Sequence, residues 1–452
     1  MDWLMKGYLC DPGAGWEDRA TILIRDGKVE AIFPDEAPDI SDLPVLDLQD
    51  HLILPGLVDM HVHFREPGGE YKETIASGSA AAVAGGFTSV ACMPNTSPPL
   101  DNAAQISYVL KKARLADLAR VYPVGAVTLG QQGENLADHE AMAEAGAVAF
   151  SDDGRPIMNS RLMADVLKKG SALGRPIIDH CEDLTLSAGG VVYEGATGRC
   201  LGVPMVSRAA ESVQVARDLV LQRATGGTLH LAHLSTRESV ELFCRAREAG
   251  QDVSAEVTPH HLLLTEEAVK VCAADAKMNP PLGDAEDRSA LQDALVQGLL
   301  DIVATDHAPH HQEEKGRSLL EAPFGVVGLE TSFALLYTFL VKKGLLTLEA
   351  LVRAMSLHPA RRLNIPGGTL SPGAPADLVV VDPQRNWSVD QRAFFSLGKN
   401  TPFQGWKLCG SPVMTMVNGD MKMFRGRVKG VSADFPPLAE MIKARPPGQD
   451  EE

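Results

Sequence analysis

Two histidines separated by a single residue, His61 and His63, follow an apolar run that extends from Leu52 to Met60. In a β-strand, residues i and i+2 point to the same face, so both imidazoles can bind one metal ion side by side. Arg65 lies two residues further on, where its guanidinium can hold an anionic substrate beside that metal. The spacing therefore predicts metal-assisted chemistry on a small anion.

Further residues of the types that bind metals follow other short apolar runs: the adjacent pair Asp152 and Asp153, then His180, His233 and Asp306. Imidazole and carboxylate are the usual nitrogen and oxygen ligands of zinc. Metal binding can lower the pKa of water from 15.7 to about 7, which supplies a nucleophile at neutral pH. We therefore expect these residues to form a metal site together with His61 and His63.

The elements that must bring these residues together are eight short apolar runs that alternate with segments of helical period. Eight strand–helix units predict a parallel (β/α)8 barrel, in which residues at the carboxyl ends of the strands meet at one active-site mouth. The expected strands are Leu57–His63, Phe87–Met93, Val121–Val127, Ala147–Phe150, Pro176–Asp179, Leu229–Ala232, Val253–Val257 and Ile302–Thr305.

Both ends of the chain show strand patterns instead. Asp26-Gly27-Lys28 lies between two apolar runs and predicts a hairpin, and Asn418-Gly419-Asp420 predicts a second one. We expect the two ends to join into one small β domain. The expected boundaries are 1–55 and 363–430 for the two parts of the β domain, 56–362 for the barrel, and 431–452 for a mobile tail rich in proline and charge.

The composition excludes several kinds of partner. The net charge is −17, which argues against nucleic acid or an anionic membrane surface as a partner. An anionic substrate then needs a local positive site. The seven cysteines form no C-x-x-C pair, which indicates reduced thiols and a cytoplasmic protein. No signal peptide is visible, and the longest apolar stretch, Phe333 to Val341, is too short to span a bilayer.

At this point the chain resembles the class I dihydroorotases of the amidohydrolase superfamily. The resemblance extends from about residue 20 to about residue 425. It rests on five motifs, which are Val58 to Gly68, Met93-Pro94-Asn95-Thr96, Asp179 to Asp183, Met278 to Leu282 and Ala304 to His310. The resemblance implies a (β/α)8 barrel with a composite β domain, one or two zinc ions, and reversible ring closure of N-carbamoyl-L-aspartate to L-dihydroorotate in pyrimidine synthesis.

The resemblance also implies roles for individual residues. His61, His63 and Asp306 would hold one metal position, His180 and His233 the other, and Asp153 would lie between them. Asp306 would act as general base and then as general acid. Arg65, Asn95, Asn279 and His310 match positions that bind substrate, although a loop-stabilising role for His310 stays open.

Some positions differ from the relatives or carry no assigned chemistry. Many members of the superfamily place a carboxylated lysine after the fourth strand, where this chain has Asp152 and Asp153. Asp153 is favoured because the family pattern places the ligand just before a glycine. The missing lysine counts against hydantoinase activity. We interpret His260 and His261 as structural residues or as outer partners of the metal ligands, and the segment His311–Phe324 as a lid.

Two other functions remain open at this stage. One is a different cyclic amidohydrolase such as an allantoinase. The other is a non-catalytic scaffold for aspartate transcarbamoylase, and association with that enzyme is open for an active chain as well. We expect a small anionic substrate (carbamoyl aspartate or dihydroorotate), a homo-oligomer, and neither nucleic acid nor membrane as a partner.

Overall fold

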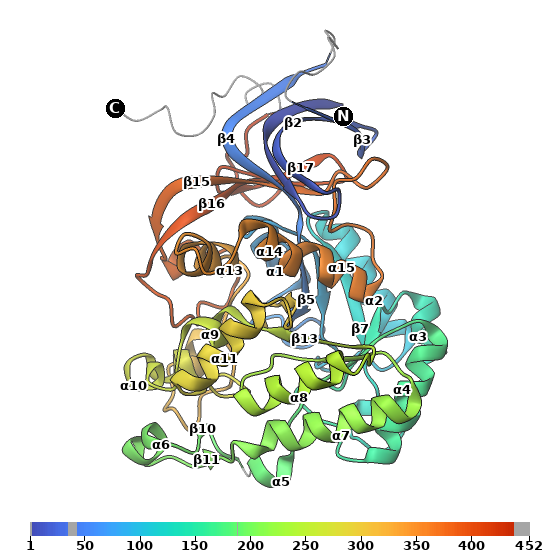
Figure 1. The fold of residues 1–452 in the computed structure, drawn as a ribbon, viewed down its shortest axis with the longest axis vertical. Coiled ribbons are helices and arrows are strands. Elements are labelled where there is room, and N and C mark those ends of the chain that lie inside the picture. The colour runs from blue at the N-terminus through green and yellow to red at the C-terminus, as the bar shows by residue number, and fades with distance from the viewer. Residues whose placement is uncertain (1, 35–42, 188, 438–452) are drawn as a thin grey trace.

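Two eight-stranded sheets form the framework of the protein, and helices surround one of them (Figure 1). The structure is a computed structural model that describes residues 2–34, 43–187 and 189–437. The tail expected over 431–452 lies outside the described residues from position 438 onward.

The first sheet is the barrel, and its eight parallel strands are the eight that the sequence predicts. Each strand pairs with its neighbour in chain order. The strands are β5 (Leu57–Val62), β6 (Phe87–Cys92), β7 (Arg120–Gly125), β8 (Ala149–Phe150), β9 (Ile177–Asp179), β12 (Leu229–Leu231), β13 (Val253–Val257) and β14 (Ile302–Val303). The predicted (β/α)8 fold class is confirmed.

Helices cover the outside of the barrel, and polar caps begin many of them. The side chains of Asn102, Asn159 and Asp284 accept hydrogen bonds from the first backbone amides of their helices. The longer helices are α1 (Ile75–Ala84), α2 (Ala103–Ala116), α3 (His139–Ala145), α4 (Ser160–Leu173), α7 (Ala209–Thr225), α8 (Arg237–Glu248) and α11 (Ala285–Val296).

Short elements fill the connections. The α-helical ones are α5 (Leu184–Ser187), α6 (Ala196–Leu201), α9 (Pro259–Leu263), α10 (Ala268–Cys272), α12 (Gln312–Lys315), α13 (Ser332–Leu336), α14 (Leu348–Val352) and α15 (His358–Leu363). Single 3-10 turns are η1 (Leu129–Gln131), η2 (Ala273–Ala276) and η5 (Gln391–Ala393), and η3 (Tyr337–Val341) and η4 (Arg353–Leu357) are π-helical. Strands β10 (Val192–Tyr193) and β11 (Met205–Val206) form a small separate sheet.

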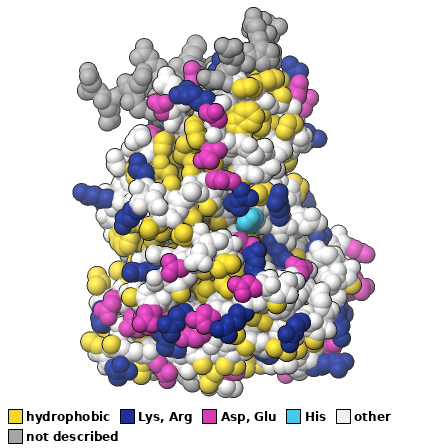
Figure 2. Space-filling view, in the orientation of Figure 1, with side chains coloured by type: hydrophobic (Ala, Val, Ile, Leu, Met, Phe, Trp, Pro, Cys, Tyr) yellow, Lys and Arg dark blue, Asp and Glu magenta, His cyan; other side chains and the backbone are white. Residues whose placement is uncertain are grey.

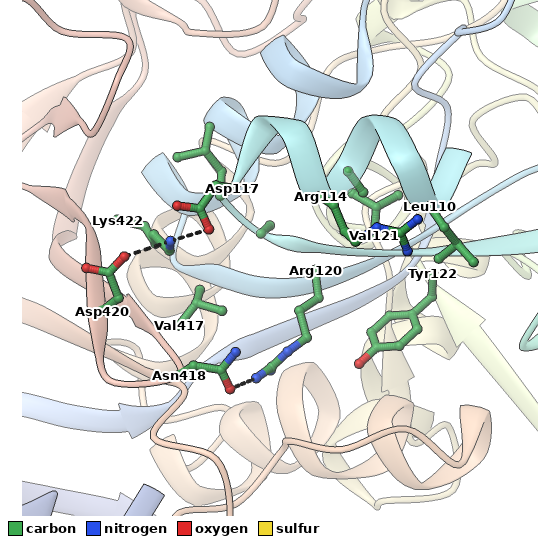
Figure 3. Close-up of a pocket in the computed structure, with 13 residues that line it drawn as sticks. Leu110, Arg114, Asp117, Arg120, Val121, Tyr122, Val417, Asn418, Asp420 and Lys422 are labelled. Carbon is green, nitrogen blue, oxygen red and sulfur yellow. Dashed lines mark hydrogen bonds and ion pairs between the residues drawn. The ribbon is translucent and has the colours of Figure 1, made fainter. Parts of the chain in front are cut away.

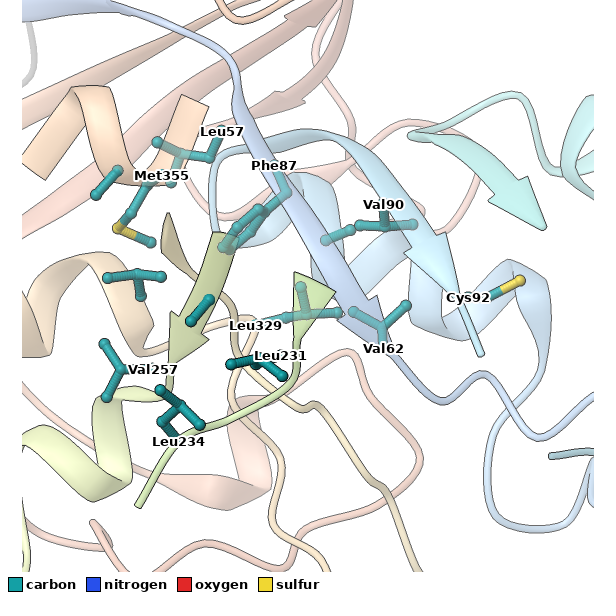
Figure 4. Close-up of a cluster of buried hydrophobic side chains, with 14 of the residues drawn as sticks. Leu57, Val62, Phe87, Val90, Cys92, Leu231, Leu234, Val257, Leu329 and Met355 are labelled. Carbon is teal, nitrogen blue, oxygen red and sulfur yellow. The ribbon is translucent and has the colours of Figure 1, made fainter. Parts of the chain in front are cut away.

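Apolar side chains fill both faces of the barrel strands. Met60, Val124, Ile178 and Ile302 belong to one buried cluster, to which most of the strands contribute. A larger cluster lies between the strands and the surrounding helices, and Figure 4 shows part of it, including Leu57, Phe87, Leu231 and Val257. Apolar residues on both faces explain why the strands read as continuous apolar runs.

The second sheet contains strands from both ends of the chain, as predicted. Its order is β18-β17-β16-β15-β4-β1-β2-β3. The strands are β1 (Trp3–Asp11), β2 (Trp16–Arg25), β3 (Lys28–Pro34), β4 (Val45–Pro55), β15 (Leu378–Ser388), β16 (Lys407–Val417), β17 (Asp420–Phe424) and β18 (Arg427–Val428). The two ends join where β4 pairs antiparallel with β15.

Both predicted hairpins are present in this sheet. Asp26 and Gly27 connect β2 to β3, and Asn418 and Gly419 connect β16 to β17. All four residues have positive φ, from 48° to 74°. This is the backbone of the two-residue turns that favour Asp-Gly and Asn-Gly.

Charged side chains join the barrel to the second sheet around a cavity of about 470 Å³ (Figure 3). Arg120 at the start of β7 contacts Asp377 and Asn418. The Lys422 ammonium donates to Asp117 and Asp420, each at 2.8 Å. These contacts fix the sheet against the end of the barrel that lies opposite the carboxyl ends of the strands.

The seam of the barrel lies between β14 and β5. In the described residues only one backbone bridge, between Val62 and His307, joins the two sides there. The buried Asp59 carboxylate strengthens this seam because it accepts hydrogen bonds from the backbone N–H groups of Thr305 (3.2 Å) and His61 (3.0 Å). Asp59 therefore ties the strand of the paired histidines to the strand that precedes Asp306.

We expect Asp59→Ala to destabilise the fold by about 1–3 kcal/mol, because buried backbone donors then lose their acceptor. Thermal unfolding measures this loss. Asp293→Ala, which changes an exposed aspartate of α11, is the matched control. Equal melting temperatures for the two variants would show that the seam does not depend on Asp59.

Candidate metal centre and active site

The structure brings all six predicted metal ligands together at the carboxyl ends of the barrel strands. His61 is in β5 and His63 follows it directly, whereas Asp153, His180, His233 and Asp306 lie one to three residues beyond β8, β9, β12 and β14. All six are buried. His233 and Asp306 have positive φ values of 31° and 46°, and strained backbone of this kind clusters at functional sites.

The paired histidines do not sit on a regular strand. Between Asp59 and Val62, β5 contains one residue more than the facing part of β6, from Val90 to Cys92. An extra residue of this kind is a bulge, which redirects side chains and is common beside active sites. The two-residue spacing therefore predicted where the two histidines lie in the chain, while the bulge changes the direction in which their side chains point.

Asp153 lies at the centre of the cluster. Its carboxylate oxygens are 3.4 Å from His61 Nε2, 3.6 Å from His63 Nε2, 3.7 Å from His180 Nδ1 and 3.8 Å from His233 Nε2. Burial alone would raise the pKa of Asp153, but the imidazoles, His61 foremost, hold it well below its usual value. The neighbouring Asp152 points elsewhere and accepts hydrogen bonds from the backbone of Val127 and Thr128.

Asp306 closes the cluster on the β14 side. Its Oδ1 lies 2.9 Å from His63 Nε2 and 3.7 Å from His61 Nε2. Burial opposes its charge, but the hydrogen bond to His63 and the nearby imidazoles keep its pKa below the usual value. Asp306 is therefore a carboxylate at neutral pH, positioned to accept a proton.

The donor set fits a divalent metal ion. His61 Nε2 and Asp153 Oδ1 are buried atoms without a hydrogen-bond partner, and an unpaired buried polar atom is costly. Ligand atoms of His61, His63 and Asp306 lie within 4.8 Å of one another, as do those of His61, Asp153 and His233. Two imidazoles and a carboxylate in each group match a common catalytic zinc site.

Outer partners fix which nitrogen of each imidazole faces the cluster. His61 Nδ1 donates to Glu256 Oε1 at 2.6 Å, and His63 Nδ1 donates to Asn95 Oδ1 at 2.9 Å. A carboxylate or an amide oxygen can only accept, so Nε2 of both rings carries the lone pair for a metal. His180 Nε2 donates to Glu182 at 2.9 Å, which leaves its Nδ1 for the metal.

Sequence reasoning missed Glu256. Its carboxylate on β13 also accepts from His230 Nε2 at 3.0 Å, so it holds two imidazole rings at once. The available signal was an acidic residue inside the otherwise uncharged strand Val253–Val257, since an isolated buried charge requires a partner. Carboxylates behind metal-binding histidines orient the ring and raise its basicity.

Two of the predicted substrate residues contact the ligand cluster directly. Asn95 Nδ2 donates to Asp153 Oδ2 at 3.3 Å, in addition to the contact of Asn95 with His63. Asn279 Nδ2 donates to Glu182 at 2.9 Å and lies 3.2 Å from His180 Nε2. Both amides therefore lie at the edge of the cluster.

The other two, Arg65 and His310, lie side by side. An Arg65 guanidinium nitrogen is 3.3 Å from His310 Nε2, and Arg65 Nε donates to the carbonyl of Pro309. His310 Nε2 also donates to the Phe324 carbonyl at 2.7 Å. This contact supports the loop-stabilising interpretation of His310.

His260 and His261 differ in their hydrogen bonds. His261 bridges Thr258 Oγ1 and the Pro280 carbonyl with its two ring nitrogens. His260 is buried, and its Nε2 has no partner. Hydrogen bonds therefore explain a structural role for His261, whereas the His260 ring packs against that of His261 with the centroids 4.6 Å apart.

The chain is similar to dihydroorotases. A family model described as dihydro-orotase-like matches residues 50–239. The dihydroorotase of Syntrophus aciditrophicus is 49% identical over 416 residues, which cover 92% of this chain and 97% of that protein. The dihydroorotase of Geobacillus kaustophilus is 46% identical and covers 94% of this chain and 99% of its own length.

Solved structures of hydantoinases share the fold. L-hydantoinase from Arthrobacter aurescens superposes with a TM-score of 0.84 at 29% identity, over 94% of this chain and 97% of that one. A dihydropyrimidinase from Brevibacillus agri has a TM-score of 0.83 at 22% identity, over 95% and 96% of the two chains. This second likeness concerns the fold alone.

We expect Glu256→Ala to weaken metal binding by about 10–100-fold, because His61 loses the acceptor that orients it. Competition with a chromophoric chelator measures the affinity without any assay of turnover. Asp287→Ala, which removes another buried carboxylate at the start of α11, controls for general damage. If both variants bind metal as tightly as the unchanged protein, Glu256 has no part in holding the ion.

We also expect acid to release the metal. Burial opposes charge on His61 and His180, but Glu256 and Asp153 around His61, and Glu182 and Asp153 around His180, raise the pKa of both. A metal binds only the deprotonated ring, so protons compete from a higher pH than at an ordinary histidine, whose pKa is about 6.5. Equilibrium dialysis at decreasing pH measures retained metal, and unchanged retention down to about pH 5 would contradict the expectation.

Proposed function

The chain belongs to the dihydroorotase family, and from this premise we propose that it catalyses the reversible ring closure of N-carbamoyl-L-aspartate to L-dihydroorotate in pyrimidine synthesis. Relatives named dihydroorotase that are 45–49% identical over most of the chain support this activity. The observation that carries the proposal is the position of Asp153 among four imidazoles, beside Asp306.

Zinc is the proposed cofactor, with one or two ions per chain. His61, His63 and Asp306 would hold one position, His180 and His233 the other, and Asp153 would lie between them. An ion bound there lowers the pKa of water and polarises the carbonyl that is attacked. The Asp153 side chain reaches less far than a carboxylated lysine would, so we expect weaker metal binding at the second position. Metal analysis measures how far that position is occupied.

Asp306 is the proposed catalytic acid and base. In the hydrolytic direction its carboxylate takes a proton from the attacking water and delivers it to the ring nitrogen, while the ring C–N bond breaks. In ring closure Asp306 takes the proton from the ureido nitrogen as the new C–N bond forms. It then passes this proton to a carboxyl oxygen, which takes up a second proton from solvent and leaves as water when its C–O bond breaks. Asp306 Oδ1 lies 2.9 Å from His63 Nε2, which places the carboxylate beside the proposed metal position for both steps.

Arg65 and Asn95 are proposed to bind the substrate carboxylate, and Asn279 and His310 to contact the rest of the substrate. A guanidinium pairs with a carboxylate through two parallel charged hydrogen bonds. Lys72 Nζ lies 3.4 Å from His310 Nδ1 and adds positive charge to this corner. Such a local positive site answers the repulsion that a chain with a net charge of −17 exerts on an anion.

The remaining proposals concern the surroundings of the enzyme. The described cysteines are all unpaired, which supports a reducing, cytoplasmic location. Acidic and basic side chains are interspersed on the face shown in Figure 2, which supports a small-molecule partner over nucleic acid. We also propose that the chain forms a homo-oligomer and that it associates with aspartate transcarbamoylase. Co-purification of two differently tagged copies tests the first proposal, and co-purification with that enzyme tests the second.

The membrane question has one structural finding. None of the helices in the described parts of the chain is both long enough and apolar enough to cross a bilayer.

The deciding assay offers carbamoyl aspartate, dihydroorotate, hydantoin and allantoin to one preparation. We expect turnover of the first two only, loss of activity on chelation and recovery with zinc. Preferred turnover of hydantoin or allantoin would reject the proposed function.

Asp306→Asn should reduce kcat by about 10²–10⁴-fold because proton transfer is lost, whereas Arg65→Ala should chiefly raise KM. Near-normal kcat in Asp306→Asn would reject the proposed role of Asp306.

A further inference from the structure

A buried ammonium group lies at the junction of three segments near the proposed substrate residues. Lys315, at the end of α12, is 7% exposed. Its Nζ lies 2.9 Å from the carbonyl oxygen of Gly325, 3.1 Å from that of Pro323 and 3.4 Å from that of Lys277. An ammonium has three N–H donors, so these three carbonyls can use all of them.

The backbone of Gly325 is the centre of this junction. Its N–H donates to the Lys277 carbonyl at 2.9 Å, and its φ is +131°. A Cβ atom at this position would come within 2.7 Å of the Ala308 Cβ atom. Glycine therefore lets the carbonyl approach both Lys315 and the loop that carries Ala308.

A side chain from the segment that connects β15 to β16 of the second sheet completes the junction. Asn400 lies between β15 and β16 and is 3% exposed. Its Oδ1 accepts from the backbone N–H of His310, and its Nδ2 donates to the carbonyls of Ala308 and Gly325, all at 3.0 Å. The Gly325 carbonyl therefore receives hydrogen bonds from Lys315 and Asn400 together.

Two of the three segments joined in this way carry proposed substrate residues. Lys277 is two positions before Asn279, and Asn400 holds the backbone of His310, which contacts Arg65. The third is the segment His311–Phe324, which the sequence analysis interpreted as a lid. A second buried lysine, Lys277, holds that segment through the carbonyls of Leu320 and Ala322.

We propose that Lys315 and Asn400 are positioning residues that fix the substrate loops around Asn279 and His310 relative to each other. The inference rests on the proposed function. Neither residue touches the metal ligands, so their role concerns how substrate is bound and not how metal is held. A buried ammonium costs free energy unless it is fully hydrogen-bonded, and here backbone carbonyls of the loops themselves supply the bonds.

The test replaces each residue and measures KM, kcat and bound metal separately. In Lys315→Met, whose side chain is similar in length but cannot donate, we expect KM for carbamoyl aspartate to rise about tenfold, as for the loss of one charged hydrogen bond. We expect kcat to change less than about twofold and metal content to stay at the wild-type value. Asn400→Ala should behave alike. Asn400→Asp keeps the acceptor for His310 but turns the donor group into an acceptor that faces the Ala308 and Gly325 carbonyls, so it should raise KM at least as much as Asn400→Ala.

Lys168→Met, at an exposed position of α4, is the matched control and should leave KM unchanged. Unchanged KM in both Lys315→Met and Asn400→Ala would overturn the proposal, and so would a fall in kcat and metal content at constant KM. If Lys315→Met does not fold, Asn400→Asp alone decides by the same criteria.

Hydrogen exchange separates this proposal from the proposed function. Backbone amides over residues 308–311 and 316–328 should exchange faster in the Lys315 and Asn400 variants than in the Lys168 control. An inactive wild-type protein would reject the function, while unchanged exchange in the variants would reject the junction whether or not the protein turns over substrate.

Discussion

A buried carboxylate among four imidazoles is the interaction on which the site depends. Asp153 lies 3.4–3.8 Å from nitrogen atoms of His61, His63, His180 and His233. These side chains come from four different strands, so the closed barrel is what brings them together. Buried carboxylates are costly unless their charges are paired, and a bound cation would balance the charges of Asp153 and Asp306. Outer partners such as Glu256 and Glu182 then set the orientation of the rings.

The sequence was informative wherever a local rule determines the result. Apolar runs predicted all eight barrel strands, and the Asp-Gly and Asn-Gly turns predicted both hairpins, because these signals are contained in a few neighbouring residues. The types and strand-end positions of His61, His180 and Asp306 predicted that they would meet. The preference for Asp153 over Asp152 came from the family pattern. The structure supplies a physical reason, because the Asp152 carboxylate accepts hydrogen bonds from the backbone N–H groups of Val127 and Thr128 and points away from the cluster.

Features that depend on pairing between distant segments could not be predicted in this way. The bulge in β5 exists only relative to β6, and the role of Glu256 becomes visible only when β13 pairs with β12 and the Glu256 side chain reaches His61 of the non-adjacent strand β5. Asn400 lies 90 residues from His310, to which its side chain is hydrogen-bonded. No spacing rule connects such pairs, since the fold alone brings them into contact.

Fold and activity carry different information here. Hydantoinase structures superpose closely on this chain, yet one fold hosts many reactions, and the site decides among them. The curated relatives of higher identity are named dihydroorotase. The end of β8 carries aspartate where a lysine would favour the hydantoinase interpretation, and Arg65 offers a charge suited to a carboxylate. The second sheet contributes to this site as well, because its β15–β16 connection holds the backbone of His310.

Anomalous X-ray diffraction from zinc-loaded crystals tests the central claim most directly. The account predicts a strong zinc peak in contact with Asp153 and with imidazole nitrogens from His61, His63, His180 or His233, on either one or both sides of that carboxylate. Zinc that binds elsewhere, with Asp153 outside its coordination, would contradict the account.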